Sequence, residues 1–278
     1  MTSGVSRDTS EENVAKQGWR WTKGLVLVAA VAVLWEVLPR VGVIDPVLLP
    51  PLSRVLGRGA ELLVSGVLVE HAAASLWRVL LGFSLAMAVA VPLGIALGLW
   101  PAVEDFVDLG LQLLRPLSPP AWIPLAILWF GIGNPPAIFI IFIGTVFATM
   151  VGVAAATRDV DRSLVEVALT EGANHWQAVR YVVIPALMPA LFAQVRVGLG
   201  LAWMCVIAAE MVAVHKGLGY MMIDARSLFR VDDVLVGMMA VGALGLAMDA
   251  VLRVVEGRVL AWREGTTARE LFAATRAR

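Results

Sequence analysis

Long runs of apolar residues, separated by short polar stretches, dominate the pattern along this chain. The runs are about twenty residues long, which is the length of an α-helix that crosses the hydrocarbon core of a bilayer. A β-barrel strand would need only about ten residues of alternating polarity, so the pattern favours helices. We expect an all-α, polytopic membrane protein with about six transmembrane helices. The predicted spans are Gly24–Ile44, Leu76–Trp100, Val107–Ile132, Ala137–Ala156, Leu187–Val214 and Val234–Val255.

The amino-acid composition agrees with an integral membrane protein. Of the 278 residues, 59% are hydrophobic and only 16% are charged, and the mean hydropathy is +0.82. A soluble domain usually carries about 25% charged residues. The formal net charge is zero, so it gives no indication of nucleic-acid binding. A single cysteine, Cys205, excludes an intrachain disulfide, and the three scattered histidines do not form a metal-ligand motif.

The first predicted span follows Arg20 and Lys23 and contains Ala-Val-Ala, so a cleaved signal peptide is the alternative interpretation. Its apolar character continues to Ile44, far enough to span, and we expect it to be retained. An even number of spans puts both termini on one side. Lys and Arg residues near the termini then place both in the cytoplasm. The expected organisation is an N-terminal tail (residues 1–23), a transmembrane domain (24–256) and a C-terminal tail (257–278).

The third predicted span contains an unusual number of prolines, in LRPLSPPAWIPLAILWFGIG from Leu114 to Gly133. Proline lacks a backbone donor and clashes with the preceding turn, so the helix should break or kink near Ser118. Broken backbone at membrane depth is tolerated where it is buried in protein or lines a watery cavity. The break therefore either lines a pathway or only helps the helices to pack.

Charged side chains inside spans are costly and are usually functional or paired. Glu210, in the sequence IAAEM, is the strongest candidate, and Arg196 lies in the same span. Both structural pairing and a direct transport role remain open for Glu210. Four other charged residues lie nearer predicted span ends, where snorkelling is the simpler interpretation: Glu36, Arg78, Arg115 and Asp249. The candidate translocation pathway comprises Arg115, Ser118, Pro119, Trp122, Trp203 and Glu210.

A polar segment, residues 158–185, separates the fourth and fifth spans. Apolar residues at helical spacing from Val165 to Val183 predict an amphipathic helix, and Trp176 falls on that face. Ser163 and Glu166 match a capping box, which predicts a helix start at Ser163. Gly172 should interrupt the helix, and Pro185 should mark the beginning of the next one. On pattern alone, an amphipathic loop lying on the membrane surface explains the segment too, with Glu166 serving only as a cap.

The polar segment resembles the cytoplasmic signature of ABC importer permeases, which reads Glu-Ala-Ala, three residues, Gly, nine residues, Ile-x-Leu-Pro. Glu166, Ala168, Gly172 and Pro185 match it. Val167 replaces its second residue, and Val182 and Ile184 are conservative departures. The proline-rich third span, IAAEM, and GLGYMMIDARSLFR from residue 217 to residue 230 resemble the nitrate/sulfonate/taurine branch of this family. The resemblance extends over residues 49–262.

This resemblance implies a MetI-like permease in the bacterial cytoplasmic (inner) membrane. Two copies, as a homodimer surrounded by membrane lipid, would work with two ABC ATPase subunits and a periplasmic or lipid-anchored substrate-binding protein. ATP and Mg would bind the ATPase, because this chain has no P-loop; no cofactor, metal, catalytic or nucleic-acid site is expected in it. The chain would be a transport subunit and no enzyme. The substrate implied is a small anion or zwitterion such as nitrate, an alkylsulfonate or taurine.

Two sets of residues follow from the resemblance. ATPase coupling would involve Glu166, Ala168, Gly172, Ala173, His175, Trp176, Arg180 and Pro185. Docking of the binding protein would involve Lys216, Asp224, Arg226 and Arg230. The alternative is a gradient-driven secondary transporter or channel that acts without an ATPase. A membrane anchor without transport would leave the broken third span unexplained.

Overall fold

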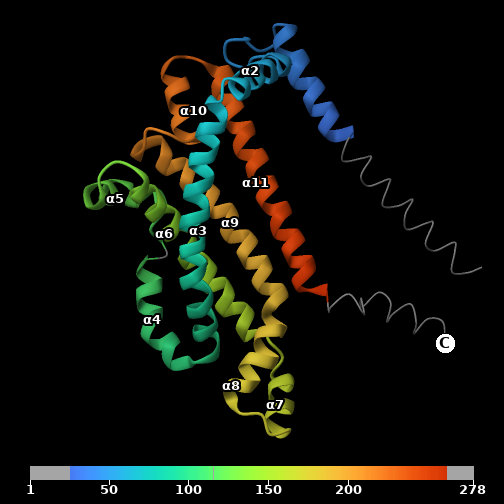
Figure 1. Ribbon diagram of the computed structural model, residues 1–278, viewed down its shortest axis with the longest axis vertical. Helices are drawn as coiled ribbons and strands as arrows, with labels where there is room; N and C mark the ends of the chain where they lie inside the picture. The colour runs from blue at the N-terminus through green and yellow to red at the C-terminus, as the bar shows by residue number, and fades with distance from the viewer. Residues whose placement is uncertain (1–25, 115, 262–278) are drawn as a thin grey trace, which may run out of the picture.

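A computed structural model describes residues 26–114 and 116–261 of the chain. Within these ranges the regular structure is entirely helical, which confirms the predicted fold class. The long helices run side by side along one axis of the molecule (Figure 1). After a first helix over residues 26–40, the α-helices are α2 (Leu52–Val64), α3 (Val67–Leu99), α4 (Pro101–Leu114), α5 (Ile123–Phe130), α6 (Asn134–Arg158), α7 (Arg162–Thr170), α8 (His175–Ala178), α9 (Ile184–Ala213), α10 (Leu218–Ser227) and α11 (Val231–Val259).

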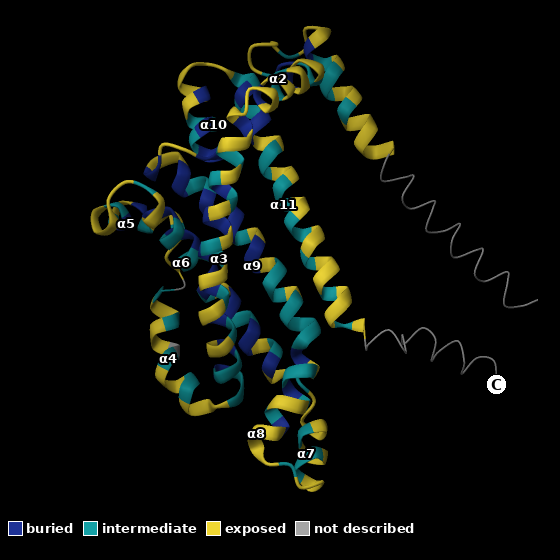
Figure 2. Cartoon of the chain, in the orientation of Figure 1, coloured by how far each residue is buried: buried dark blue, intermediate teal, exposed yellow. Residues whose placement is uncertain are grey.

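Four of the described helices are long and apolar enough to cross a membrane: Val67–Leu99, Asn134–Arg158, His175–Ala213 and Val231–Val259. They coincide with four of the predicted spans, although α3 begins at Val67, well before the predicted Leu76. The first predicted span begins outside the described residues and is helical over residues 26–40. Figure 2 shows that α11 and the first helix present mostly exposed residues, whereas buried residues concentrate in α6 and α9.

The third predicted span is divided, as its prolines predict. Helix α4 ends at Leu114, a short 3-10 turn η1 follows at Pro119–Trp122, and α5 covers only Ile123–Phe130. Figure 1 shows α4 and α5 as two separate helices on the same side of α3. The predicted break near Ser118 is therefore confirmed, and neither piece is long enough to cross a bilayer alone.

The core forms where α6 packs against α3 and α9, and small residues allow the close approach of α3 and α6. A Cβ atom added at Gly82 or Gly94 of α3 would lie 2.7 Å from the Cβ of Ile141 or Val153 of α6. Lipid tails are as apolar as the side chains of membrane helices, so the hydrophobic effect does little to bring these helices together. Close backbone contact of this kind is therefore a main source of their association.

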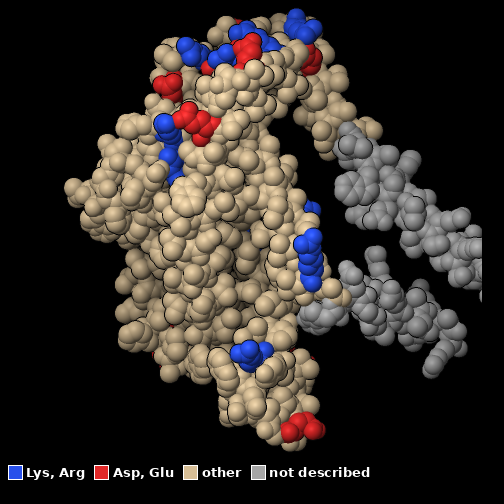
Figure 3. All heavy atoms as spheres, viewed as in Figure 1, with Lys and Arg blue, Asp and Glu red and all other residues tan. Residues whose placement is uncertain are grey.

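The two ends of the bundle are formed by different short helices. Helices α2 and α10 lie at one end, here called the α10 end, and α7 and α8 lie at the other, the α8 end (Figure 1). Figure 3 shows charged side chains gathered at the α10 end above a broad belt that is nearly free of charge apart from basic side chains at one edge, as expected for a membrane protein. Helix α2 lies across the α10 end rather than along the bundle.

Candidate functional site

The polar segment begins with a helix cap. The Asp161 carboxylate accepts a hydrogen bond from the backbone N–H of Ser163 at 2.9 Å, and α7 starts at Arg162. The predicted capping box at Ser163 is therefore wrong, because Asp161 is the non-helical N-cap residue and Ser163 already lies inside the helix. The hydrogen bond from Ser163 lowers the pKa of Asp161. A capping box does form further on, where Asn174 and Gln177 exchange two hydrogen bonds of 2.8 Å at the start of α8.

Gly172 ends α7, as predicted. Its φ is +92°, and the N–H groups of Gly172 and Ala173 donate to the carbonyls of Leu169 and Ala168 at 3.1 and 3.0 Å. This pair of bonds is the Schellman turn, in which glycine is the preferred residue because it has no Cβ. The chain thus reverses between α7 and α8, so the apolar spacing counted through Gly172 does not define one common face.

From α8 onward the helix is continuous to the α10 end. A π-helical turn, η2 (Val179–Val183), joins α8 to α9, and the helix from His175 to Ala213 has 39 residues. Helix α9 begins next to Pro185, as predicted, but no break separates it from α8. Pro185 has no N–H to donate, and the widened turn just before it lets the helix pass the proline. At about 1.5 Å per residue, this helix is about 58 Å long.

The predicted coupling residues all lie at the α8 end. Trp176 is 65% exposed, although tryptophan is usually well covered in a folded chain. The buried Ala178 and Val183 hold this part of the helix against the bundle. Of the other predicted residues, Glu166, Gly172, His175 and Arg180 are exposed, and Ala168, Ala173 and Pro185 are half-buried. The α8 end therefore presents an aromatic side chain that the described chain does not cover.

At the α10 end, a buried polar cluster surrounds Glu210, which is fully buried. Its carboxylate accepts hydrogen bonds from Arg78 Nη1 at 2.6 Å, from the Ser75 hydroxyl at 2.8 Å and from the Gly219 N–H at 2.9 Å. The N–H of Leu218 donates to the Ser75 hydroxyl. Because Leu218 and Gly219 form the first turn of α10, the carboxylate satisfies the helix N-terminus and ties α10 to α3 and α9.

Arg78 was missed as a partner of Glu210, and the prediction that it snorkels is wrong. The side chain is only 4% exposed, because the guanidinium binds Glu210, the Lys216 carbonyl at 2.6 Å and Asn134 Oδ1 at 2.8 Å. The signal available in the sequence was Glu210 itself, since a buried carboxylate requires a partner. Asp249 is also paired rather than free, at 2.9 Å from Arg196.

The predicted pathway residues are not all brought together. Trp203 belongs to a core cluster against which the half-buried Trp122 packs, and Pro119 borders the close contact between Gly144 and Cys205. Ser118 is exposed, whereas the Glu210 carboxylate faces α3 and α10. Arg115 lies outside the described residues. The structure therefore shows that Glu210 is paired within the bundle, and a direct role of Glu210 in transport stays a prediction.

The predicted docking residues lie at the α10 end. Lys216 forms an ion pair with Glu70 at 2.5 Å, whereas Asp224, Arg226 and Arg230 are exposed. The neighbouring α2 is joined to α11 by an ion pair between Arg58 and Asp233 at 2.6 Å, and this ion pair raises the pKa of Arg58 above its ordinary value.

Within the described residues, no group of three or more His, Cys, Asp or Glu side chains could hold a metal ion.

Residues 90–261 match the family described as binding-protein-dependent transport system inner membrane component. The chain belongs to this family. This permease is 41% identical over 258 residues to a protein of Methanocaldococcus jannaschii named as an ABC transporter permease, covering 87% of this chain and 94% of that protein. It is 33% identical over 259 residues to SsuC of Bacillus subtilis, named as an aliphatic sulfonates transport permease; the alignment covers 92% of this chain and 94% of SsuC. It is 30% identical over 255 residues to the taurine transport system permease protein TauC of Escherichia coli; the alignment covers 88% of this chain and 93% of TauC.

The fold of this permease is also known from solved structures. A chain of the MetNI methionine ABC transporter, in inward facing conformations, matches with a TM-score of 0.57 at 20% identity, covering 68% of this chain and 96% of that one. At that identity the likeness shows the MetI-like fold alone. The family match and the named relatives show that this chain is an ABC importer permease, a multi-helix transport subunit of the membrane and not an enzyme.

Proposed function

We propose that this permease is driven by ATP hydrolysis in a separate ABC ATPase, which seats against the polar segment. The observation that carries the proposal is the exposed Trp176 on a helix that continues without interruption to the buried Glu210. An amphipathic helix that offers one large apolar anchor is a common way to fill a groove on a partner protein. Movement of the partner would be transmitted along the same rigid helix to the α10 end.

The proposed assembly contains two copies of this permease, two ATPase subunits that bind ATP and Mg, and a periplasmic or lipid-anchored binding protein. The termini and the polar segment would lie in the cytoplasm, and the α10 end would face outward from the inner membrane. Coupling would involve Trp176 and Ala173 as anchors, with Glu166, His175 and Arg180 as polar neighbours. The proline-broken stretch from Ser118 to Trp122 would line the pathway together with Trp203 and Glu210.

The proposed substrate class is a small anion or zwitterion. Two relatives with well-covered alignments are named for aliphatic sulfonates and for taurine, both of which carry a sulfonate group. The half-helix formed by η1 and α5 begins with Pro119 and Pro120, which have no N–H to donate, so only its dipole would favour a negative charge, because a helix N-terminus carries partial positive charge. Nitrate, which is smaller, belongs to the same chemical class.

Proteoliposomes that contain the purified complex test this function directly. In liposomes whose ATPase subunits face the lumen, we expect uptake of a radiolabelled alkylsulfonate or taurine. This uptake should require both ATP in the lumen and the binding protein in the outer solution. Gly172→Pro and Trp176→Asp should each abolish uptake while leaving membrane insertion intact. Uptake by the permease alone under an ion gradient, without ATP, would contradict the proposal and favour gradient-driven transport.

A further inference from the structure

Helix α10 ends in a second Schellman turn, and its central residue is a phenylalanine. The N–H of Phe229 donates to the Arg226 carbonyl at 3.1 Å, and the N–H of Arg230 donates to the Ala225 carbonyl at 2.8 Å. Phe229 has a φ of +57°, and among the described residues it is the one non-glycine residue with positive φ. The corresponding position after α7 holds Gly172, the residue that this turn prefers.

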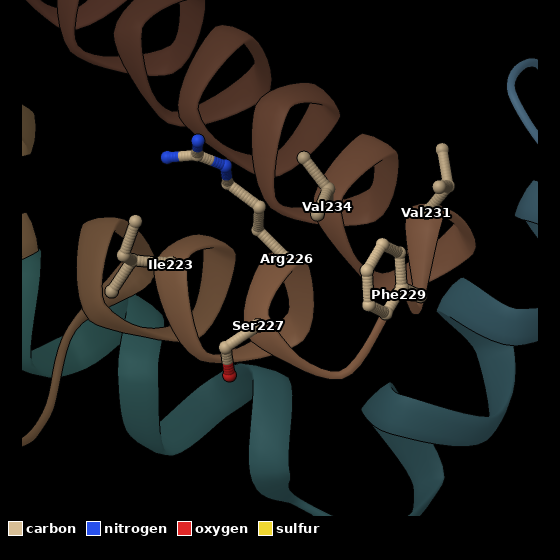
Figure 4. Close-up of a pocket in the computed structure, with 6 residues that line it drawn as sticks. All are labelled: Ile223, Arg226, Ser227, Phe229, Val231 and Val234. Atoms are coloured by element: carbon tan, nitrogen blue, oxygen red, sulfur yellow. The ribbon is translucent and has the colours of Figure 1, made fainter.

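The Phe229 ring does not contribute to the protein core. It is 86% exposed and borders a hollow of about 550 Å³ at the bend between α10 and α11. Figure 4 shows the ring at this bend beside Val231, with the Arg226 side chain rising from α10 next to α11. A bulky side chain with positive φ is disfavoured in the backbone, and an exposed ring returns little by burial. Folding of this chain therefore gives no reason for a phenylalanine here.

The charges around Phe229 are unbalanced. Arg226 and Arg230 are exposed and form no ion pair with any described carboxylate, and the exposed Asp224, which also forms no ion pair among the described residues, offsets only one of their charges. The other cations at this end are paired: Arg54 with Asp232, Arg58 with Asp233, and Lys216 with Glu70. The bend thus presents one aromatic ring and two unpaired guanidinium groups within five residues of the chain, and aromatic residues and arginine are enriched at protein–protein interfaces.

The ring lies on the aqueous side of the bundle rather than in lipid. The first turn of α11 carries Asp232 and Asp233, whose carboxylates bind α2 at 2.8 and 2.6 Å. Charged groups of this kind belong to the water layer outside the hydrocarbon core. Phe229 comes two residues before α11 in the chain, and Figure 3 shows charged side chains gathered at this end of the molecule.

We propose that Phe229 is the main anchor for the extracytoplasmic binding protein, and that Arg226 and Arg230 flank it. The complementary surface on the partner would be an apolar recess that accepts the ring, bordered by carboxylates that face the two guanidinium groups. Such a centre of aromatic contact with surrounding charge is typical of interface hot spots. This inference rests on the proposed function, because it assigns the partner that the proposed importer requires.

The affinity of the binding protein for the complex in lipid nanodiscs tests the inference. The probe is the substrate-loaded binding protein that stimulates ATP hydrolysis by the wild-type complex. We expect Phe229→Asn to weaken binding at least roughly tenfold, a loss that hot-spot residues commonly show. Asparagine tolerates positive φ, so this variant should unfold at the same temperature as the wild type or a higher one. Arg226→Gln with Arg230→Gln should flatten the decrease of affinity with rising salt.

Val64→Asn is the matched control, because Val64 is a 91% exposed apolar residue of α2 at the same end of the molecule. It should leave the affinity unchanged. Wild-type affinity in Phe229→Asn would overturn the inference while the proposed function stands. Unchanged affinity together with lower thermal stability in anionic nanodiscs would instead assign the ring to lipid. If the wild-type complex hydrolysed ATP but bound no binding protein, the proposed importer and this inference would both fail.

Discussion

The ion pair between Arg78 and Glu210 allows a quantitative prediction. Glu210→Met keeps most of the side-chain volume but leaves the Arg78 guanidinium, which is 4% exposed, without its carboxylate. Removing one partner of a buried ion pair typically costs about 3–5 kcal/mol. Arg78 would keep its two other acceptors, but the Ser75 hydroxyl and the Gly219 N–H would lose theirs, so we expect a loss of at least about 3 kcal/mol.

Two further variants separate the ion pair from general disruption. Arg78→Met combined with Glu210→Met should be less destabilising than Glu210→Met alone, because replacing both charges by apolar groups is often nearly neutral. Asp232→Asn breaks the pair with Arg54, which is 64% exposed, and an exposed pair contributes at most about 1 kcal/mol. Burial, rather than the number of ion pairs, therefore decides the magnitude.

Thermal unfolding of the purified protein in one detergent measures all three variants. For a chain of this size, 1 kcal/mol shifts Tm by roughly 2–4 °C, so Glu210→Met should lower Tm by at least roughly 6 °C. Asp232→Asn should lower it by no more than about 4 °C. The reasoning is refuted if Glu210→Met and Asp232→Asn give equal shifts, or if the double variant is less stable than Glu210→Met.

Two other predictions concern packing and capping. Gly144→Ala should destabilise the protein by about 1–3 kcal/mol in the same unfolding assay, because the added Cβ would overlap Cys205 Sγ. Gly110→Ala, in the helix α4, should instead stabilise the protein by roughly 0.5–1 kcal/mol, because its added Cβ would meet no neighbouring atom. The hydrogen bond from Ser163 holds the pKa of Asp161 below its ordinary value. The cap therefore stabilises α7 fully when the pH is above the ordinary pKa of an aspartate, and this stabilisation is lost as the pH falls through the lowered pKa. Asp161→Ala should therefore speed amide hydrogen exchange in the first turn of α7 at neutral pH and have little further effect in strong acid; an equal effect at both pH values would contradict this.

The spans and the broken third span could be predicted because each depends on residues close together in the chain. Twenty apolar residues suffice to predict a helix, and the prolines from Pro116 to Pro124 locate the break. The turn at Gly172 could be predicted for the same reason, since a lone glycine inside an amphipathic pattern is a local signal.

The partner of Glu210 could not be predicted in this way. Arg78 lies 132 residues away in the sequence, and its position near a predicted span end suggested snorkelling. Only the packing of α3 against α9 and α10 shows that it is buried. The cap on α7 was misplaced for a different reason: Asp161 and Ser163 are both good capping residues, and the backbone of the preceding turn decides between them.

Phe229 illustrates a third limit. Nothing in the residues around it signals a positive φ, because glycine or asparagine usually provides that conformation. The continuous helix past Pro185 was likewise hidden, since a π turn upstream is not visible in the sequence. Features that depend on strained or widened backbone therefore needed the structure.

Purification of the permease from its native membranes tests the central claim, that the α8 end seats an ATPase. We predict that an ATPase with a Walker A motif copurifies at about one copy per permease chain. It should be lost in Trp176→Asp and retained in Trp100→Asp, which changes a 52% exposed tryptophan outside the polar segment. A permease that emerges without an ATPase, from a preparation in which other ABC complexes stay intact, would contradict the claim.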